Sequence, residues 1–241
     1  MSKVTRRDLL KATAAASSAA VVSWFSTRPA VAESTPQPAP VAAPGTYSYF
    51  TQAEVIFLDA ALSRLIPADA LGPGAKEAGG TFFIDQQMAG AFGRGESWYM
   101  QGPWKDGTEQ QGYQLKLTPA QLYRLGIKGT EDYCQHTFGG KNFSQLDAAT
   151  QDKVLHGLEK GEIELTGVPA KEFFAMLCQN THEGFFADPM YGGNRDFAGW
   201  KLIGFPGPRY NYTDEILQFG KPYVLPPVGL MGRGGVPVRK S

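Results

Sequence analysis

Apolar side chains recur at intervals of three and four residues in five segments of the chain, and this spacing predicts helices. The first helix begins at a capping box formed by Thr51 and Glu54, in which each side chain satisfies a backbone N–H of the first turn. Pro67 ends it. Its apolar face consists of Val55, Leu58, Leu62, Leu65 and Ile66.

Four further helices are predicted, at about 75–91, 118–138, 144–161 and 169–186. The third of the five has a capping threonine at Thr118 followed by Pro119 at the first helical position, and we expect a kink within it at Gly126 or Gly129. No segment alternates convincingly between apolar and polar residues, and no internal repeat is present. The predicted fold is therefore mainly α, with about five helices and long loops rich in glycine, proline and aromatic residues.

Two loop regions have an unusual composition. The loop at 93–112 contains Trp98, Tyr99 and Trp104. Loops generally lie at the surface, so these aromatic side chains either cover the protein's own core or meet a partner. From Ala187 onward, turn-forming residues dominate, and we expect the last segment, 225–241, to form an irregular, extended arm.

The N-terminus has the features of a twin-arginine export signal. Arg6 and Arg7 lie in a basic segment, and an apolar run of small residues follows. This run is interrupted by serines and is shorter than the roughly 20 residues that a membrane-spanning helix needs. Residues 30–32 form a small-x-small cleavage site, which predicts cleavage between Ala32 and Glu33.

The resulting organisation has four parts. Residues 1–32 are a cleaved signal peptide, 33–46 a linker rich in proline and alanine, 47–224 a helical domain and 225–241 the arm. Because twin-arginine signals are addresses read by the translocase, we expect a periplasmic protein. Any association with a membrane would then come through partners.

Composition limits the classes of partner. The full chain has 23 basic and 23 acidic residues. Removal of residues 1–32 takes away one acidic residue, Asp8, and five basic ones, so the mature chain is mildly acidic. The basic residues removed are Lys3, Arg6, Arg7, Lys11 and Arg28. A mildly acidic chain argues against nucleic-acid binding.

Motifs for catalysis or cofactor binding are missing from the sequence. It contains no Gly-x-Gly-x-x-Gly after a strand, no Cys-x-x-Cys-His and no Gly-x-Ser-x-Gly. His182 and Glu183 begin a His-Glu-x-x-His pattern, but Phe186 occupies the second histidine position. We therefore predict no catalytic, cofactor-binding or metal-binding residue in this chain.

Two cysteines, Cys134 and Cys178, follow the signal. An oxidising compartment permits a disulfide between them. One internal bridge, two buried thiols and a bridge from one cysteine to another chain all fit the sequence.

The densest group of polar residues lies between Glu183 and Asp196. It fits a small binding site or an interface, because tyrosine, tryptophan and arginine are the usual interface anchors. It also fits an elaborate structural turn, in which side chains cap helices and glycines adopt positive φ. We assign the predicted partner interface to Trp98, Trp104, Tyr191, Arg195 and Trp200.

Four blocks of sequence resemble a known family. They are Arg64–Asp69 (Arg-Leu-Ile-Pro-Ala-Asp), Phe83–Asp85 (Phe-Ile-Asp), Glu183–Asn194 (Glu-Gly-Phe-Phe-Ala-Asp-Pro-Met-Tyr-Gly-Gly-Asn) and Ala198–Gly207 (Ala-Gly-Trp-Lys-Leu-Ile-Gly-Phe-Pro-Gly). With these blocks, the chain resembles the small subunit (subunit 3, or gamma) of gluconate 2-dehydrogenase-type complexes, from about Tyr49 to Tyr212.

The resemblance implies a non-catalytic subunit. In such complexes a flavoprotein of the glucose-methanol-choline type holds FAD and oxidises a sugar or sugar acid, and a multihaem cytochrome c passes electrons to quinones. The small subunit assists maturation of the flavoprotein and supplies its export signal. The alternatives are a stand-alone exported enzyme or a periplasmic ligand-binding protein that uses the cluster between Glu183 and Asp196.

Overall fold

A computed structural model describes residues 46–105, 107–209, 211–223 and 225–232. The predicted signal peptide, most of the linker and the last part of the arm lie outside the described residues. Over the described ranges the chain is helical and contains no strand, which confirms the prediction of a mainly α fold. The α-helices are α2 (Gln52–Leu65), α3 (Gly80–Ala89), α4 (Ala91–Arg94), α5 (Pro119–Thr137), α6 (Ala148–Lys160), α7 (Ala170–Phe186) and α8 (Ala198–Ile203).

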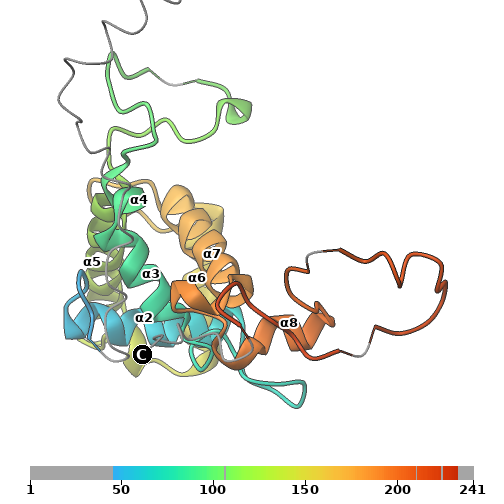
Figure 1. Cartoon of the computed structure of the whole chain (residues 1–241). Helices are drawn as coiled ribbons and strands as arrows, with labels where there is room; N and C mark the ends of the chain where they lie inside the picture. The colour runs from blue at the N-terminus through green and yellow to red at the C-terminus, as the bar shows by residue number, and fades with distance from the viewer. Residues whose placement is uncertain (1–45, 106, 210, 224, 233–241) are drawn as a thin grey trace, which may run out of the picture. The chain divides into compact units, whose positions relative to one another are not determined.

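The long helices α2, α3, α5, α6 and α7 surround one core (Figure 1). α7 packs against α6 and α3, and α2 lies against α3 and α6. Aromatic rings fill the centre: the Phe57 ring lies 5.1 Å from Phe143 and 6.5 Å from Phe173, and Tyr123 meets Phe173 edge-on at 5.9 Å. All four side chains are fully buried.

Three predicted helices match the structure closely. α2 begins directly after the capping Thr51 and ends before Ile66 and Pro67, and α5 and α7 lie within a residue of the predicted bounds. α5 runs without interruption through Gly126 and Gly129. A Cβ at Gly126 would lie 2.2 Å from the Phe173 ring. This glycine therefore allows close packing of α5 against α7.

Two predicted helices begin later than expected. α3 starts at Gly80 because Gly79 adopts a left-handed conformation (φ 84°), which ends the preceding turn. α6 starts at Ala148 because the Asp147 side chain accepts the Thr150 N–H and caps the helix there. The short helices α4 and α8 were not predicted. Among the helices of the described residues, none has both the length and the apolar character needed to cross a bilayer.

The loop between α4 and α5 extends away from the helices in Figure 1. Trp98 is half-buried in it and lies 5.6 Å from Phe92 and 4.7 Å from Tyr113. Trp98 therefore holds the base of this loop against α4, while Tyr99 and Trp104 are exposed.

Candidate functional site

The segment from Asp188 to Gly199, called here the 188–199 turn, has a strained backbone. Asn194, Asp196 and Phe197 have positive φ values of 45°, 55° and 58°. A residue other than glycine in this region costs about 1–3 kcal/mol, and such residues cluster at functional sites. Three of them within four positions require strong local support.

Asn194 supplies much of that support. Its side chain is fully buried. Its Nδ2 donates to the Ala187 carbonyl at 2.8 Å, and its Oδ1 accepts the Gly199 N–H at 2.8 Å. The amide thus joins the end of α7 to the start of α8 and closes the turn.

The turn also packs directly on the residues that precede α3 and on α7. The Arg195 N–H donates to the Ala78 carbonyl at 2.9 Å. A Cβ at Gly79 would lie 2.6 Å from the Arg195 Nε, and a Cβ at Gly193 would lie 2.1 Å from the Gly184 carbonyl oxygen. Close approach to the backbone of α7 therefore explains the glycine at position 193.

Trp200 anchors the turn from the α8 side. Its Nε1 donates to the Phe186 carbonyl at 2.7 Å. Its ring stacks on Phe197 at 5.3 Å and meets Phe205 edge-on at 5.0 Å. Only 5% of its surface is exposed, so Trp200 offers almost no area to a second protein.

Part of the predicted arm returns to this turn. The Leu230 N–H donates to the Asp188 carboxylate at 2.7 Å, and the Val228 N–H donates to the Pro206 carbonyl at 3.2 Å. Asp188 also accepts the Met190 N–H, which caps the short helix at 189–191. One carboxylate therefore holds both the turn and the C-terminal segment.

An exposed apolar surface borders the turn, formed by Leu71, Leu202, Ile203 and Phe205 and called here the α8 surface. A hollow of about 180 Å³ lies between the 65–73 segment and α8, lined by Pro67, Leu71 and Leu202 among others. Two of the sequence blocks, Arg64–Asp69 and Ala198–Gly207, thus line the same hollow.

A second hollow, of about 410 Å³, lies on the α3–α7 side of the turn. Its lining includes Phe83, Glu183, Phe186 and Tyr191. Phe186 and Tyr191 are both exposed. The cluster between Glu183 and Asp196 therefore contains a structural turn together with exposed aromatic side chains at its edge.

The predicted interface residues fall into two groups. Tyr191, Arg195 and Trp200 belong to the turn or its anchor, whereas Trp98 and Trp104 lie in the loop between α4 and α5. Their assignment to a partner interface stays a prediction. Sequence reasoning missed the leucines and Ile203 of the α8 surface. The sequence features that could have indicated this surface are the apolar runs Leu-Ile-Pro in the block Arg64–Asp69 and Leu-Ile-Gly-Phe in the block Ala198–Gly207.

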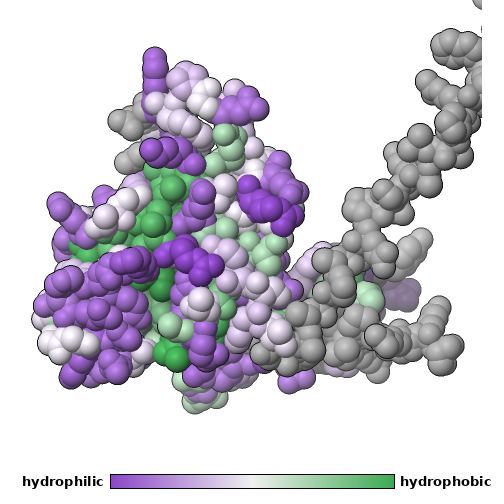
Figure 2. Space-filling model, turned by 90° about the vertical axis from the view of Figure 1, so that its left-hand side faces the viewer, coloured by the Kyte–Doolittle hydropathy of each residue, from purple (hydrophilic) through white to green (hydrophobic). Residues whose placement is uncertain are grey.

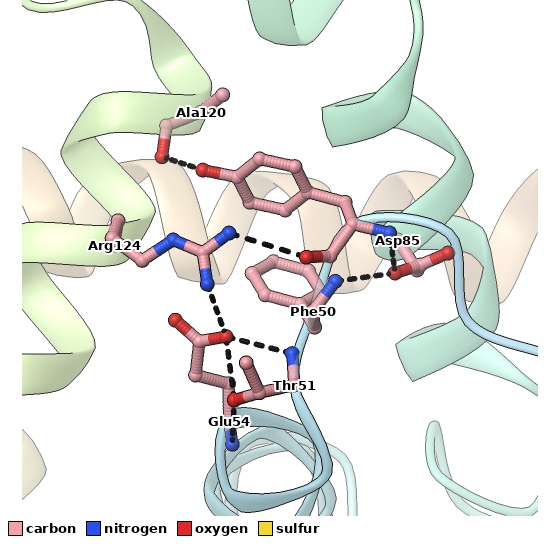
Figure 3. Close-up of polar contacts among 7 residues, drawn as sticks. Phe50, Thr51, Glu54, Asp85, Ala120 and Arg124 are labelled. Carbon is pink, nitrogen blue, oxygen red and sulfur yellow. Dashed lines mark hydrogen bonds and ion pairs between the residues drawn. The ribbon is translucent and has the colours of Figure 1, made fainter.

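Asp85 fixes the point at which the N-terminal segment joins the body (Figure 3). The Asp85 side chain is fully buried and accepts the backbone N–H groups of Ser48, Tyr49 and Phe50 at 2.7, 2.9 and 2.9 Å. Such charge-assisted bonds are among the strongest in proteins. They hold the segment in place over three consecutive residues.

A second set of contacts ties the same segment to α5. The Tyr49 hydroxyl donates to the Ala120 carbonyl at 2.6 Å. Arg124 donates to the Tyr49 carbonyl at 3.2 Å and to the Glu54 carboxylate at 2.6 Å, and its guanidinium lies 4.5 Å from the Tyr49 ring centre. Residues 48–54 are therefore held by both α3 and α5, and we call these contacts the N-terminal anchor.

The face that carries α5 shows a band of apolar side chains between polar ones (Figure 2). A hollow of about 450 Å³ lies there between α2 and α5, with Ile56 and Leu125 in its lining and Lys128 and Glu131 among its charged residues. Burial raises the pKa of Glu131, and the N–H of Phe143, which it accepts at 2.8 Å, partly offsets this effect.

Cys134 and Cys178 are free thiols and are not bonded to each other. Cys134 is fully buried, and this burial, with a smaller contribution from the charge of Glu131, raises its pKa to about 12. Cys178 is half-buried on α7, and its Sγ lies 3.9 Å from Nδ1 of His182. Burial raises its pKa as well, with the charge of Glu159 adding to the effect.

Within the described ranges, no three His, Cys, Asp or Glu side chains are grouped to hold a metal ion.

These features define a mainly helical protein with an anchored N-terminal segment and an exposed apolar surface next to a strained turn. Residues 52–207 match the model of the family described as gluconate 2-dehydrogenase subunit 3, and the chain belongs to this family. All four blocks that carry the resemblance lie within the match, so the resemblance is confirmed. No characterised protein and no solved structure matches the chain. By its family, the chain is a subunit of a multisubunit dehydrogenase complex.

Proposed function

We propose that this chain is the non-catalytic small subunit of a periplasmic, FAD-dependent sugar or sugar-acid dehydrogenase. In this role it assists maturation of the flavoprotein subunit and carries it through the twin-arginine translocase. The family match is the observation that carries the proposal. FAD lies in the flavoprotein of the glucose-methanol-choline type, and haem c lies in a membrane-bound cytochrome subunit of the same complex.

The N-terminal anchor suits an export role. When the translocase binds the signal at Arg6 and Arg7 and moves the protein, the force reaches the folded domain through residues 46–51. The buried carboxylate of Asp85 binds three consecutive N–H groups of that segment. A bond to a charged group contributes about 1.5–3 kcal/mol, so this junction resists detachment.

The α8 surface suits a binding role. Leu71 and Leu202 line the hollow beside α8, and Ile203 and Phe205, which follow Leu202 closely in the chain, are exposed as well. Apolar patches of this kind, rimmed by polar residues, mark protein interfaces. Lys201 and Glu77 provide polar groups at the neighbouring hollow, where they can set the orientation of a partner.

The export role is tested by replacing both signal arginines with lysine, Arg6→Lys together with Arg7→Lys, in cells that also make the flavoprotein subunit. We expect both proteins to remain in the cytoplasm, and flavin-dependent dehydrogenase activity to disappear from the periplasm. Arg28→Lys makes the same chemical change outside the twin-arginine pair and should leave export normal. Flavoprotein that reaches the periplasm while this chain is retained would contradict the proposal.

A further inference from the structure

The segment that follows α8 forms a loop with a fixed base. It leaves the body after Pro206 and returns at Val228, whose N–H donates to the Pro206 carbonyl at 3.2 Å. Nη2 of Arg209 donates to the Pro226 carbonyl at 2.9 Å and so joins the two sides. In Figure 1 this loop, coloured red, extends away from the helices beside α8. We call residues 208–228 the C-terminal loop.

Its tip is apolar and strongly exposed. Ile216, Leu217 and Phe219 expose 69%, 80% and 86% of their surface. Single exposed apolar residues are ordinary, but three within four positions at the tip of a protruding loop concentrate exposed apolar area there. Such a surface gains free energy when another molecule covers it.

The loop has internal structure that fixes this tip. The Ile216 N–H donates to the Tyr212 carbonyl at 3.0 Å, and Nε2 of Gln218 donates to the Asp214 carbonyl at 2.6 Å. The Tyr212 and Tyr223 rings lie 5.8 Å apart across the loop. A surface that is already ordered loses less conformational entropy when it binds.

The C-terminal loop continues the α8 surface. A hollow of about 420 Å³ lies between them and is lined by Phe205, Tyr212, Ile216 and Tyr223 among others. A partner that covers the α8 surface would therefore meet the loop as well. The two apolar regions can be buried in one interface.

Charge favours a protein over a lipid surface as the occupant. Asp214 and Glu215 directly precede the apolar tip, and Lys221 follows it. The other cation of the loop, Arg209, is engaged at the base, 5.6 Å from the Tyr223 ring. Anionic lipids attract basic segments and repel an acidic tip. A protein recess with basic side chains at its edge would complement the same charges.

We propose that the C-terminal loop docks into an apolar recess of the flavoprotein subunit, with Ile216, Leu217 and Phe219 as the anchors. Asp214 and Glu215 then face lysine or arginine side chains at the edge of that recess. This inference rests on the proposed function, because it takes the flavoprotein subunit as the partner.

The test uses the full chain, produced together with the flavoprotein subunit, and a triple variant with Ile216→Ser, Leu217→Ser and Phe219→Ser. Binding is measured by co-elution and by titration. We expect the triple variant to raise the Kd at least ~100-fold, because buried apolar anchors dominate the affinity of an interface. Its circular dichroism spectrum and Tm should match those of the parent, because the three side chains are exposed. Ile56→Ser, at an exposed apolar residue of α2, is the matched control and should bind normally.

A triple variant that binds within twofold of the parent would overturn the loop inference and leave the proposed function standing. A parent chain that does not bind the flavoprotein at all would contradict the proposed function, and the loop inference with it. A variant with Asp214→Lys and Glu215→Lys tests the charge argument. We expect it to bind more weakly than the parent, and we expect added salt to weaken the binding of the parent but not that of the variant. Tip-dependent binding to phosphatidylglycerol vesicles, without an effect on flavoprotein binding, would overturn the inference in favour of a membrane.

Discussion

The carboxylate of Asp188 accepts the backbone N–H of Leu230 at 2.7 Å, although the two residues are 42 positions apart. This contact holds the segment that follows the C-terminal loop against the 188–199 turn. Because the same carboxylate accepts the Met190 N–H, it also shapes the 188–199 turn. The exposed apolar regions on both sides of the turn therefore share one structural support.

Asp188→Asn is expected to loosen that support. An amide in place of the carboxylate directs an NH₂ group at one of the two N–H donors, so one bond is lost at a cost of about 1–3 kcal/mol of unfolding free energy. Hydrogen exchange at residues 226–232 should accelerate more than exchange in α5. Equal protection of both regions in the variant and the parent would show that Asp188 does not hold the C-terminal segment.

Asn194 is expected to be the most sensitive residue of the turn. Asn194→Ala removes two buried hydrogen bonds and places alanine in a left-handed conformation, and we expect a loss of about 3–5 kcal/mol in unfolding free energy. Asn194→Gly removes the same bonds, but glycine adopts the left-handed conformation without steric cost. The glycine variant should therefore lose less unfolding free energy than the alanine variant. Denaturant unfolding measures both values. An alanine variant as stable as the glycine variant would show that the backbone conformation carries no strain.

Local features of the sequence were sufficient to predict the bounds of α2, α5 and α7, because capping residues and prolines mark ends of these helices. They were insufficient for the start of α3. Gly79 has a positive φ there, and a Cβ at this position would lie 2.6 Å from Nε of Arg195, over a hundred positions later. A tertiary contact of this kind leaves no mark on the local pattern of apolar residues.

Asp85→Asn is expected to weaken the N-terminal anchor. Asparagine has nearly the same volume, but it offers one acceptor oxygen to three N–H donors and has no charge. We expect a loss of about 2–4 kcal/mol in unfolding free energy and faster hydrogen exchange at residues 48–50. Asp132→Asn, which removes an exposed ion pair with Lys128, should cost less than about 1 kcal/mol. Equal effects of the two substitutions would contradict a special role for Asp85.

The two thiols are expected to react at very different rates. Cys134 is fully buried and its pKa is raised to about 12, so almost none of it is thiolate at pH 8. Cys178 is half-buried and its pKa is raised, so its reaction should be slow and should accelerate as pH rises. Iodoacetamide labelling of the native protein, followed by peptide mass spectrometry, should modify Cys178 first. Labelling of Cys134 at the same rate would contradict the burial shown by the structure.

The candidate site was harder to predict than the fold. The sequence drew attention to Trp200 as an interface residue because tryptophan is a common anchor, but its indole is satisfied by the Phe186 carbonyl within the same chain. Conversely, Leu202 and Ile203 lie in a part of the sequence where turn-forming residues dominate and no helix was predicted. They are exposed because α8 has only six residues and turns its Trp200 side inward.

The most direct test of the central claim is purification of the tagged mature chain from the periplasm, with an absorption spectrum and mass spectrometry of what accompanies it. We predict a flavin spectrum and a co-purifying flavoprotein of the glucose-methanol-choline type. A single colourless protein that turns over a substrate, or binds a ligand through the Glu183–Asp196 cluster, would contradict an accessory role.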